Sequence, residues 1–168
     1  PGRYPFTRGA FPLGHRARPW TVRPLVSLGT AEETNARMKY LLRQGAAGFA
    51  IPGVSESLVW DSDAEVHIGY LGRNYVALDR LADFETLFEG IDLERVSVHL
   101  NTWHARGVAM YFALAQKRGI ELRRLRGSNS NGYNRDCIDI IEYCARHAPL
   151  WNAGYVDVRN TREAGCTA

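Results

Sequence analysis

Residues 95–126 read RVSVHLNTWHARGVAMYFALAQKRGIELRRLR, and this stretch decides the fold. Residues 95–100 are rich in Val and Leu and are typical of a short strand, while residues 102–118 carry apolar side chains at helical spacing. Gly119 follows, and glycine readily adopts the left-handed conformation that ends helices. A second strand is expected over 121–126. A strand, a helix and a strand in this order predict a parallel pair joined by a helical crossover.

The same alternation continues on both sides of this unit. Further helices are predicted over 31–44, 81–89 and 135–147, and further strands over 47–52 and 153–158. Gly45 and Gly90 are expected to end two of the helices. Thr30 and Glu33 form the pattern of a capping box, so the first helix begins directly after Thr30.

The order of elements predicts an α/β fold, namely a partial (β/α)8 TIM-type barrel with about four parallel strands and outer helices. Residues 1–28 are expected to form an extended arm at the barrel mouth, and residues 29–168 the N-terminal half of the barrel. A complete barrel takes about 250 residues, and the sequence has 168. Because an open half-barrel exposes strand edges, we expect a partner chain, a second copy or a continuation of the chain to complete it.

The composition is that of an ordinary globular domain, with 45% hydrophobic and 23% charged residues. A net charge of +3 is too small to indicate nucleic-acid binding,. No apolar run approaches the roughly 20 residues that a membrane helix needs. Neither the three cysteines nor the five histidines have the spacing of metal ligands,. We therefore expect a cytoplasmic protein without a metal site, a membrane segment or a nucleic-acid partner.

Residues 18–23 read Arg18-Pro19-Trp20-Thr21-Val22-Arg23 and carry a pattern suited to anions. Pro19 disfavours a helical conformation at Arg18, and alternation along an extended chain sends Thr21 and Arg23 to the same side. Guanidinium and hydroxyl groups bind phosphate and carboxylate oxygens. The segment therefore predicts an anion-binding edge. A second basic run, residues 123–126, is interpreted as solvated surface arginines.

These segments, taken together, resemble the methylmalonyl-CoA mutase family, large-subunit type. The family reads Arg-Pro-Trp-Thr-Ile-Arg-Gln-Tyr followed by a Thr-Ala-Glu-Glu-Ser-Asn helix start, where this chain reads RPWTVRPL and TAEETN. Collinear matches extend along the chain at residues 8–12, 60–63, 87–91, 151–152 and 163–168. The resemblance implies a barrel that binds an acyl thioester while adenosylcobalamin performs radical chemistry. The family's cobalamin-binding segment does not occur in the sequence, so adenosylcobalamin is expected only through a separate domain or subunit.

The resemblance also implies which residues contact the thioester, carried either by CoA or by the pantetheine of a carrier protein. The family's arginines and threonine in the arm are unchanged here, a Tyr is replaced by Phe, and a Thr and a Gln are both replaced by Ser. The implied substrate-binding residues are Phe11, Arg18, Thr21, Arg23, Ser128 and Ser130.

Two positions that carry chemistry in the family are altered. Leu25 replaces the Tyr that lies over the reacting carbon, and Asn160 replaces the His that hydrogen-bonds the thioester carbonyl and acts as an acid. An amide donates a hydrogen bond but has no titratable proton near neutral pH. The segment after Tyr133 in which the family carries an Arg for the substrate carboxylate is also missing. We expect thioester binding without methylmalonyl-CoA isomerisation, and an uncharged or bulkier acyl group would suit these changes.

An alternative interpretation is a catalytically silent structural subunit or scaffold of a mutase-like assembly. The simultaneous loss of the Tyr, His, Gln and Arg groups favours it. His99 and His104, near the end of a predicted strand, either line the barrel mouth or have a structural role, and the structural role is favoured. Asp61 and Asp63 are interpreted as turn or capping residues.

Overall fold

The computed structural model describes residues 2–9, 11–17, 20–52, 75–102, 105–130 and 136–154, together with residues 162, 163 and 165. The strands are β1 (Gly48–Ile51), β2 (Ser97–Leu100), β3 (Arg126–Asn129) and β4 (Trp151–Asn152). The α-helices are α1 (Ala31–Arg43), α3 (Leu81–Leu87), α4 (Ala105–Lys117) and α5 (Asp136–His147), and there are two 3-10 turns, η1 (Gly14–Arg16) and η3 (Leu122–Arg124).

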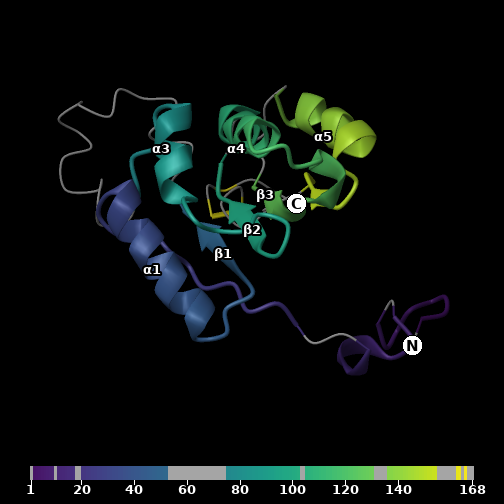
Figure 1. The fold of residues 1–168 in the computed structure, drawn as a ribbon. Coiled ribbons are helices and arrows are strands. Elements are labelled where there is room, and N and C mark those ends of the chain that lie inside the picture. Colours follow the sequence, from purple (N-terminus) through teal and green to yellow (C-terminus); the bar gives the residue numbers. More distant parts are fainter. Residues whose placement is uncertain are drawn as a thin grey trace.

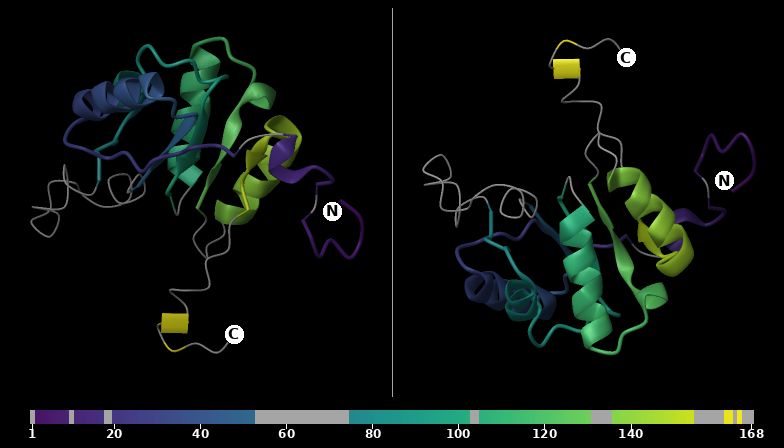
Figure 2. Two further views of the ribbon diagram at one scale, coloured as in Figure 1. Left: turned by 90° about the horizontal axis from the view of Figure 1, so that it is seen from below. Right: turned by 90° about the horizontal axis from the view of Figure 1, so that it is seen from above.

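The four strands form one parallel sheet in the order β1-β2-β3-β4, with the helices on one of its faces (Figures 1 and 2). Neighbouring helices pack in chain order, α1 on α3, α3 on α4 and α4 on α5. The predicted α/β class with four parallel strands and outer helices is confirmed. Within the described residues the sheet stays open and does not close into a barrel. None of the helices described is long and apolar enough to cross a membrane.

The helix boundaries follow the signals in the sequence. At the start of α1, the Glu33 amide donates to Thr30 Oγ1 at 3.3 Å and the Thr30 amide donates to Glu33 Oε2 at 2.9 Å, which confirms the capping box,. Gly45, Gly90 and Gly119 follow α1, α3 and α4 with φ of 95°, 68° and 71°. The left-handed conformation that we predicted at the ends of these helices is confirmed.

The predicted boundaries of the third and fourth strands are wrong. Residues 122–124 form η3, and the strand that follows is the polar run Arg126–Asn129. A side chain at Gly127 would collide with the Val98 carbonyl oxygen and the Trp151 ring, so glycine lets this run pair closely with β2. The fourth strand is Trp151–Asn152, earlier than predicted. Residues 155–158 of the prediction lie outside the described residues.

The helix-covered face of the sheet carries the core. Phe49, Ile51, Val98 and Leu100 alternate along β1 and β2 and are fully buried. They belong to the same buried cluster as apolar side chains of the helices, which include Phe84, Leu87, Tyr111 and Leu114. Successive residues of a strand point to opposite faces, so the residues between them lie on the other face. We call this the inner face, and its residues are Ala50, Ser97, His99, Arg126, Ser128 and Asn152.

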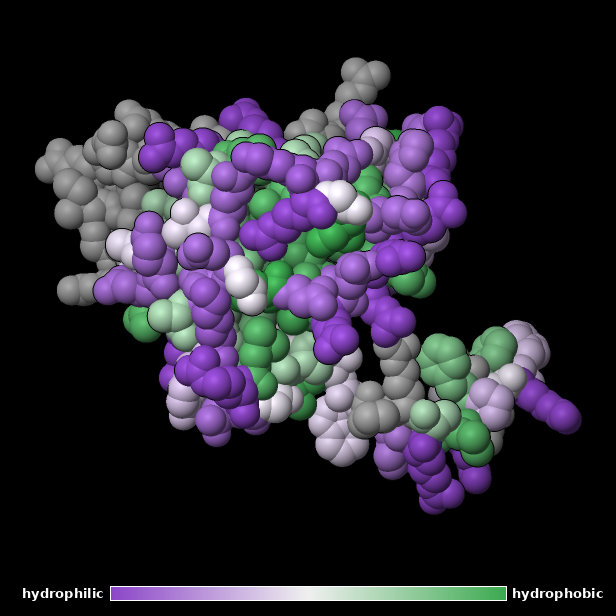
Figure 3. Space-filling view, in the orientation of Figure 1, coloured by the Kyte–Doolittle hydropathy of each residue, from purple (hydrophilic) through white to green (hydrophobic). Residues whose placement is uncertain are grey.

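The N-terminal arm reaches the sheet next to β1. The Ala47 amide donates to the Val22 carbonyl at 2.9 Å, and the Val26 amide donates to the Ala50 carbonyl at 2.9 Å. The arm upstream stands apart from the body of the molecule, and several of its apolar side chains are exposed, including Phe11 at 74% (Figures 1 and 3). The segment 22–26 therefore extends the inner face by one more backbone pairing.

Candidate functional site

One row of paired residues crosses the inner face. Leu25 forms a bridge with Ala50, Ala50 is in register with His99, His99 with Ser128, and Ser128 with Asn152. Residues in register on neighbouring parallel strands point to the same side of the sheet. The row therefore places a leucine, an alanine, a histidine, a serine and an asparagine side by side on a face that the described helices leave uncovered (Figure 2).

A second row lies one layer closer to the amino ends of the strands. Gly48 is in register with Ser97, and Ser97 with Arg126. Arg23 reaches across both rows, because its Nη1 donates to Ser128 Oγ at 3.3 Å and to Ser97 Oγ at 3.5 Å. Ordinary barrels fill their interior with bulky branched side chains. Here the corresponding face is small and polar, which leaves room for a ligand.

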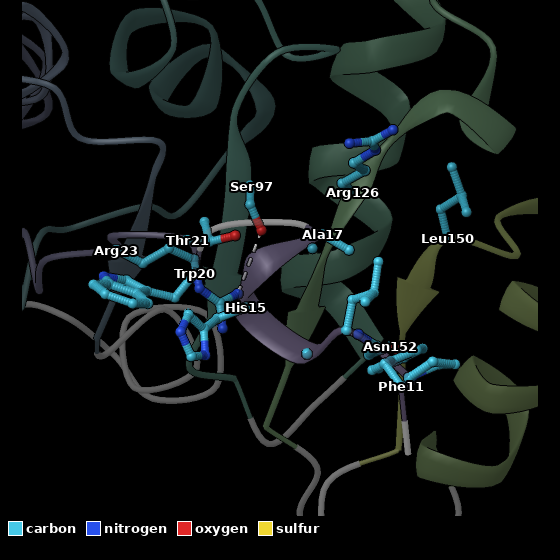
Figure 4. A pocket seen from close by; sticks show the side chains of 14 residues that line it. Phe11, His15, Ala17, Trp20, Thr21, Arg23, Ser97, Arg126, Leu150 and Asn152 are labelled. Atoms are coloured by element: carbon cyan, nitrogen blue, oxygen red, sulfur yellow. Dashed lines mark hydrogen bonds between the residues drawn. The ribbon is translucent and has the colours of Figure 1, made fainter. Parts of the chain in front are cut away.

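Residues of the arm and of the amino ends of the strands line an open cavity of about 1000 Å³ (Figure 4). In this view Arg23 points toward Ser97, with η1 of the arm on one side and β3 and β4 on the other. Arg23 and Arg126 both line the cavity, and none of its described lining residues is acidic. Two guanidinium groups with no carboxylate among the described lining residues favour an anionic ligand at a cavity of this size,.

His99 lies at the centre of the polar row. Its Nδ1 is 2.9 Å from Ser128 Oγ, and its Nε2 is 3.3 Å from Ser130 Oγ. Burial lowers the pKa of His99 below the ordinary value of 6.5, and the nearby charge of Arg23 lowers it further,. The imidazole is therefore neutral at physiological pH and can donate one hydrogen bond and accept another.

The structure brings most of the predicted binding residues together. Phe11, Thr21 and Arg23 line the cavity, while Ser128 and Ser130 are linked through His99. Alternation places Thr21 and Arg23 together at the cavity, as we expected. The substrate contacts implied for these residues remain predictions.

Of the two positions at which the family's catalytic residues are replaced, the structure describes Leu25 but not Asn160. Leu25 belongs to the row on the inner face and is 75% exposed. An exposed aliphatic side chain at this place offers apolar surface but no hydrogen bond. Arg18 and Asn160 lie outside the described residues, so the roles assigned to them stay predictions.

Sequence reasoning missed Arg126 at the cavity, whereas the hydrogen-bonded position of His99 agrees with the structural role that we favoured for it. Arg123 and Arg124 form exposed ion pairs with Glu121 and Glu94, as a solvated run should, but Arg126 lines the cavity. The signal for His99 was present, because Ser97 and His99 alternate with the buried Val98 and Leu100. A polar residue at every second position of a strand marks one uncovered face.

Within the described residues, no group of three His, Cys, Asp or Glu side chains is arranged to hold a metal ion. His104, Asp61 and Asp63 lie outside those residues. The described residues of the inner face and of the cavity present neutral hydrogen-bonding groups and guanidinium groups.

These features define an open, parallel α/β segment, consistent with part of a barrel, whose uncovered face is suited to bind a ligand. A sequence model of the methylmalonyl-CoA mutase family matches residues 1–168, and the chain belongs to this family. It is 45% identical to the 2-hydroxyisobutanoyl-CoA mutase large subunit of Aquincola tertiaricarbonis, over 98% of this chain and 33% of that protein.

Two further relatives are named as methylmalonyl-CoA mutases. The mitochondrial protein of Homo sapiens is 29% identical, and the probable mitochondrial enzyme of Caenorhabditis elegans is 30% identical. Each similarity covers 100% of this chain and 25% of the relative. The chain thus spans a quarter to a third of the length of the relatives it matches.

Proposed function

We propose that the inner face binds an acyl thioester of CoA or of carrier-protein pantetheine, and that the chain forms part of the substrate-binding barrel of an acyl mutase. The observation that carries the proposal is the row from Leu25 to Asn152. Apart from Leu25, it is a strip of small or polar side chains where a packed barrel would have bulky apolar ones,.

The amino and carboxyl ends of the strands suit the two ends of such a ligand. Arg23 and Arg126 lie at the amino ends of the strands, where the cavity opens, and are matched to the phosphates of CoA,. Gly48, Ala50 and Ser97 have side chains small enough to leave space for the slender pantetheine. The thioester would then lie near Ser130, at the carboxyl ends of the strands, where barrel enzymes perform their chemistry.

The acyl group that fits best is uncharged. Leu25 stands in the row with no charge or hydrogen-bonding group, so it favours an aliphatic portion of the ligand over a carboxylate. The relative at 45% identity is named a 2-hydroxyisobutanoyl-CoA mutase. We therefore propose a short, branched, uncharged hydroxyacyl thioester as the substrate class, in place of methylmalonyl-CoA.

A complete reaction needs groups beyond those described in this chain. The described residues hold no cofactor site, so adenosylcobalamin would be supplied by another domain or subunit, together with the rest of the barrel. The name of the 45% identical relative, a large subunit, supports a multi-subunit assembly. The residues described in this chain would bind the thioester, orient its acyl group and exclude water.

Calorimetric titration with 2-hydroxyisobutanoyl-CoA tests the binding proposal. Arg23→Ala should weaken binding by about tenfold, at the low end of what a charged hydrogen bond contributes. Arg123→Ala is the matched control, because this exposed arginine pairs with Glu121 and does not line the cavity. Raising the salt concentration screens the charge of Arg23, so it should reduce the difference in affinity between the unmodified protein and Arg23→Ala. Equal affinity of both variants and the unmodified protein would refute binding at this face.

An activity assay separates this proposal from the silent-scaffold alternative. The protein is supplied with adenosylcobalamin and the cognate cobalamin-binding subunit, and is offered 2-hydroxyisobutanoyl-CoA or methylmalonyl-CoA. We expect turnover of the hydroxyacyl substrate and none of methylmalonyl-CoA. Thioester binding without turnover of either substrate would favour the silent-scaffold interpretation, and rapid turnover of methylmalonyl-CoA would contradict the assignment of the substrate class.

A further inference from the structure

His99 is held between two hydroxyl groups from the neighbouring segment of the sheet. Ser128 lies in β3 and Ser130 directly follows the strand end, so their side chains are two residues apart and share the inner face. The Ser130 amide donates to the Leu100 carbonyl at 3.0 Å, which continues the pairing with β2. The imidazole therefore bridges Ser128 and Ser130, with one nitrogen at each hydroxyl.

A fixed cation begins this chain of hydrogen bonds. A guanidinium group only donates, so Ser128 Oγ accepts from Arg23 Nη1. Ser128 Oγ also lies 2.9 Å from His99 Nδ1, and its remaining lone pair and its proton allow it either to accept from Nδ1 or to donate to it,. When Ser128 donates, a neutral His99 carries its proton on Nε2, which faces Ser130 Oγ at 3.3 Å,.

Electrostatics favours the same direction. Arg23 contacts Ser128, the hydroxyl at Nδ1, and so its positive charge lies on the Nδ1 side of the ring. A lone pair on that side is attracted by the cation, whereas an N–H there would be repelled. The nearby charge of Arg23 and burial also lower the pKa of His99, which keeps the ring neutral and suited to relay hydrogen bonds without carrying a charge,.

We propose that His99 is a positioning residue, which fixes Ser130 Oγ as an acceptor of Nε2–H and thereby directs the Ser130 hydroxyl proton to the thioester carbonyl oxygen of the ligand. The ligand part of this inference rests on the proposed function. Ser130 is 9% exposed, at the carboxyl ends of the strands, where the acyl end of the thioester would lie. No proton is transferred, because the hydroxyl polarises the carbonyl only by a hydrogen bond.

The arrangement of the relay can be tested without any ligand. In the full-length protein labelled with 15N-histidine, long-range 1H–15N correlation spectra identify the nitrogen of each imidazole that carries the proton. We expect His99 to be neutral at pH 7 with its proton on Nε2, and we expect Arg23→Ala to move part of the population to Nδ1–H. A predominant Nδ1–H form, or a doubly protonated ring at pH 7, would overturn the relay.

Two matched substitutions test its effect on the ligand. The side-chain amide of Gln reaches the position of Nε2, so His99→Gln keeps a donor for Ser130, whereas the shorter His99→Asn reaches only the position of Nδ1 and faces Ser128. We expect His99→Asn and Ser130→Ala each to weaken binding of 2-hydroxyisobutanoyl-CoA by about three- to tenfold, the range of a neutral hydrogen bond. His99→Gln should stay within about twofold of the unmodified protein.

The thioether analogue, which differs from the thioester only by the missing carbonyl oxygen, is the decisive control. Ser130→Ala and His99→Asn should leave its affinity unchanged if Ser130 serves the carbonyl. Equal losses for thioester and thioether, or equal losses for His99→Gln and His99→Asn, would overturn the positioning role. If the unmodified protein binds neither compound, the proposed function fails and the ligand part of the inference fails with it, while the spectra alone decide the relay.

Discussion

The two faces of the sheet differ in every property that packing depends on. Phe49, Ile51, Val98 and Leu100 on the helix-covered face are fully buried and apolar. The intervening positions on the inner face carry small or polar groups, with His99 and Ser128 at the centre. The same strands therefore differ from one face to the other, since one face stabilises the fold and the described helices leave the other uncovered. Substitutions on the two faces should accordingly have effects of different kinds.

The largest expected effect is the removal of a core ring from β1. Phe49 is fully buried, so Phe49→Ala loses its transfer free energy and leaves a cavity, and should lower the free energy of unfolding by about 3–5 kcal/mol,. Ala50→Ser, one residue along on the inner face, should change it by less than about 0.5 kcal/mol. Chemical denaturation measures the free energy of unfolding of both variants. Comparable losses would show that the two faces contribute alike to stability.

A smaller effect is expected where β3 approaches its neighbours. A Cβ at Gly127 would collide with the Val98 carbonyl oxygen and the Trp151 ring, so Gly127→Ala forces the strands or the ring to shift. We expect a loss of about 1–3 kcal/mol in the free energy of unfolding. Gly154→Ala is the matched control, because a Cβ there meets no atom within 4 Å. Thermal denaturation in which both variants behave alike would show that β3 tolerates the added atom.

The helices and the first two strands could be predicted because their signals are local. Thr30 and Glu33 form a capping box within one turn, and Gly45, Gly90 and Gly119 end helices through their own backbone conformation. Such features depend on a few consecutive residues. The sequence therefore indicates them without knowledge of the rest of the fold.

The predicted position of the third strand was wrong because this strand depends on contacts with residues far away in the sequence. Arg126–Asn129 is polar and contains a glycine, which reads as a loop, but the pairing with β2 and the close approach of Trp151 make it a strand. Trp151 Nε1 donates to Asn129 Oδ1 at 2.8 Å, so a buried polar side chain is satisfied from the next strand,. Only the assembled sheet shows this partnership.

The sequence indicated several residues of the candidate site, but it did not indicate the hydrogen bonds that join His99 to Ser128 and Ser130. Thr21, Arg23, Ser128 and Ser130 were indicated by the family resemblance, and the structure places the first two at the cavity and links the serines. That His99 is the link depends on the register between β2 and β3, a long-range property of the sheet. That Arg126 lines a cavity depends likewise on the arm, whose residues line the same cavity.

A pH effect on stability should report on the inner face. Burial and Arg23 lower the pKa of His99 in the folded state, so the unfolded chain binds the proton more readily,. The contribution of neutral His99 to stability is complete above its ordinary pKa of 6.5 and is lost as the pH falls below that value,. We expect His99→Gln to weaken the loss of stability on acidification, as measured by denaturation midpoints between pH 8 and 5. Identical pH profiles for both proteins would show that His99 titrates alike in the folded and unfolded states.

The smallest expected effect lies deep in the core. Tyr111 is fully buried between the rings of Phe88 and Trp151, at centroid distances of 5.2 and 5.4 Å, and burial raises its pKa. Within the described part of the chain, its hydroxyl has no hydrogen-bond partner. A buried hydroxyl without a partner costs free energy, so Tyr111→Phe should leave the protein as stable as before or more stable by up to about 1 kcal/mol. Tyr111→Leu, which removes the ring contacts as well, should be clearly destabilising. If Tyr111→Phe were to lower the denaturation midpoint as much as Tyr111→Leu, the hydroxyl would have a hydrogen-bond partner in solution and would stabilise the core.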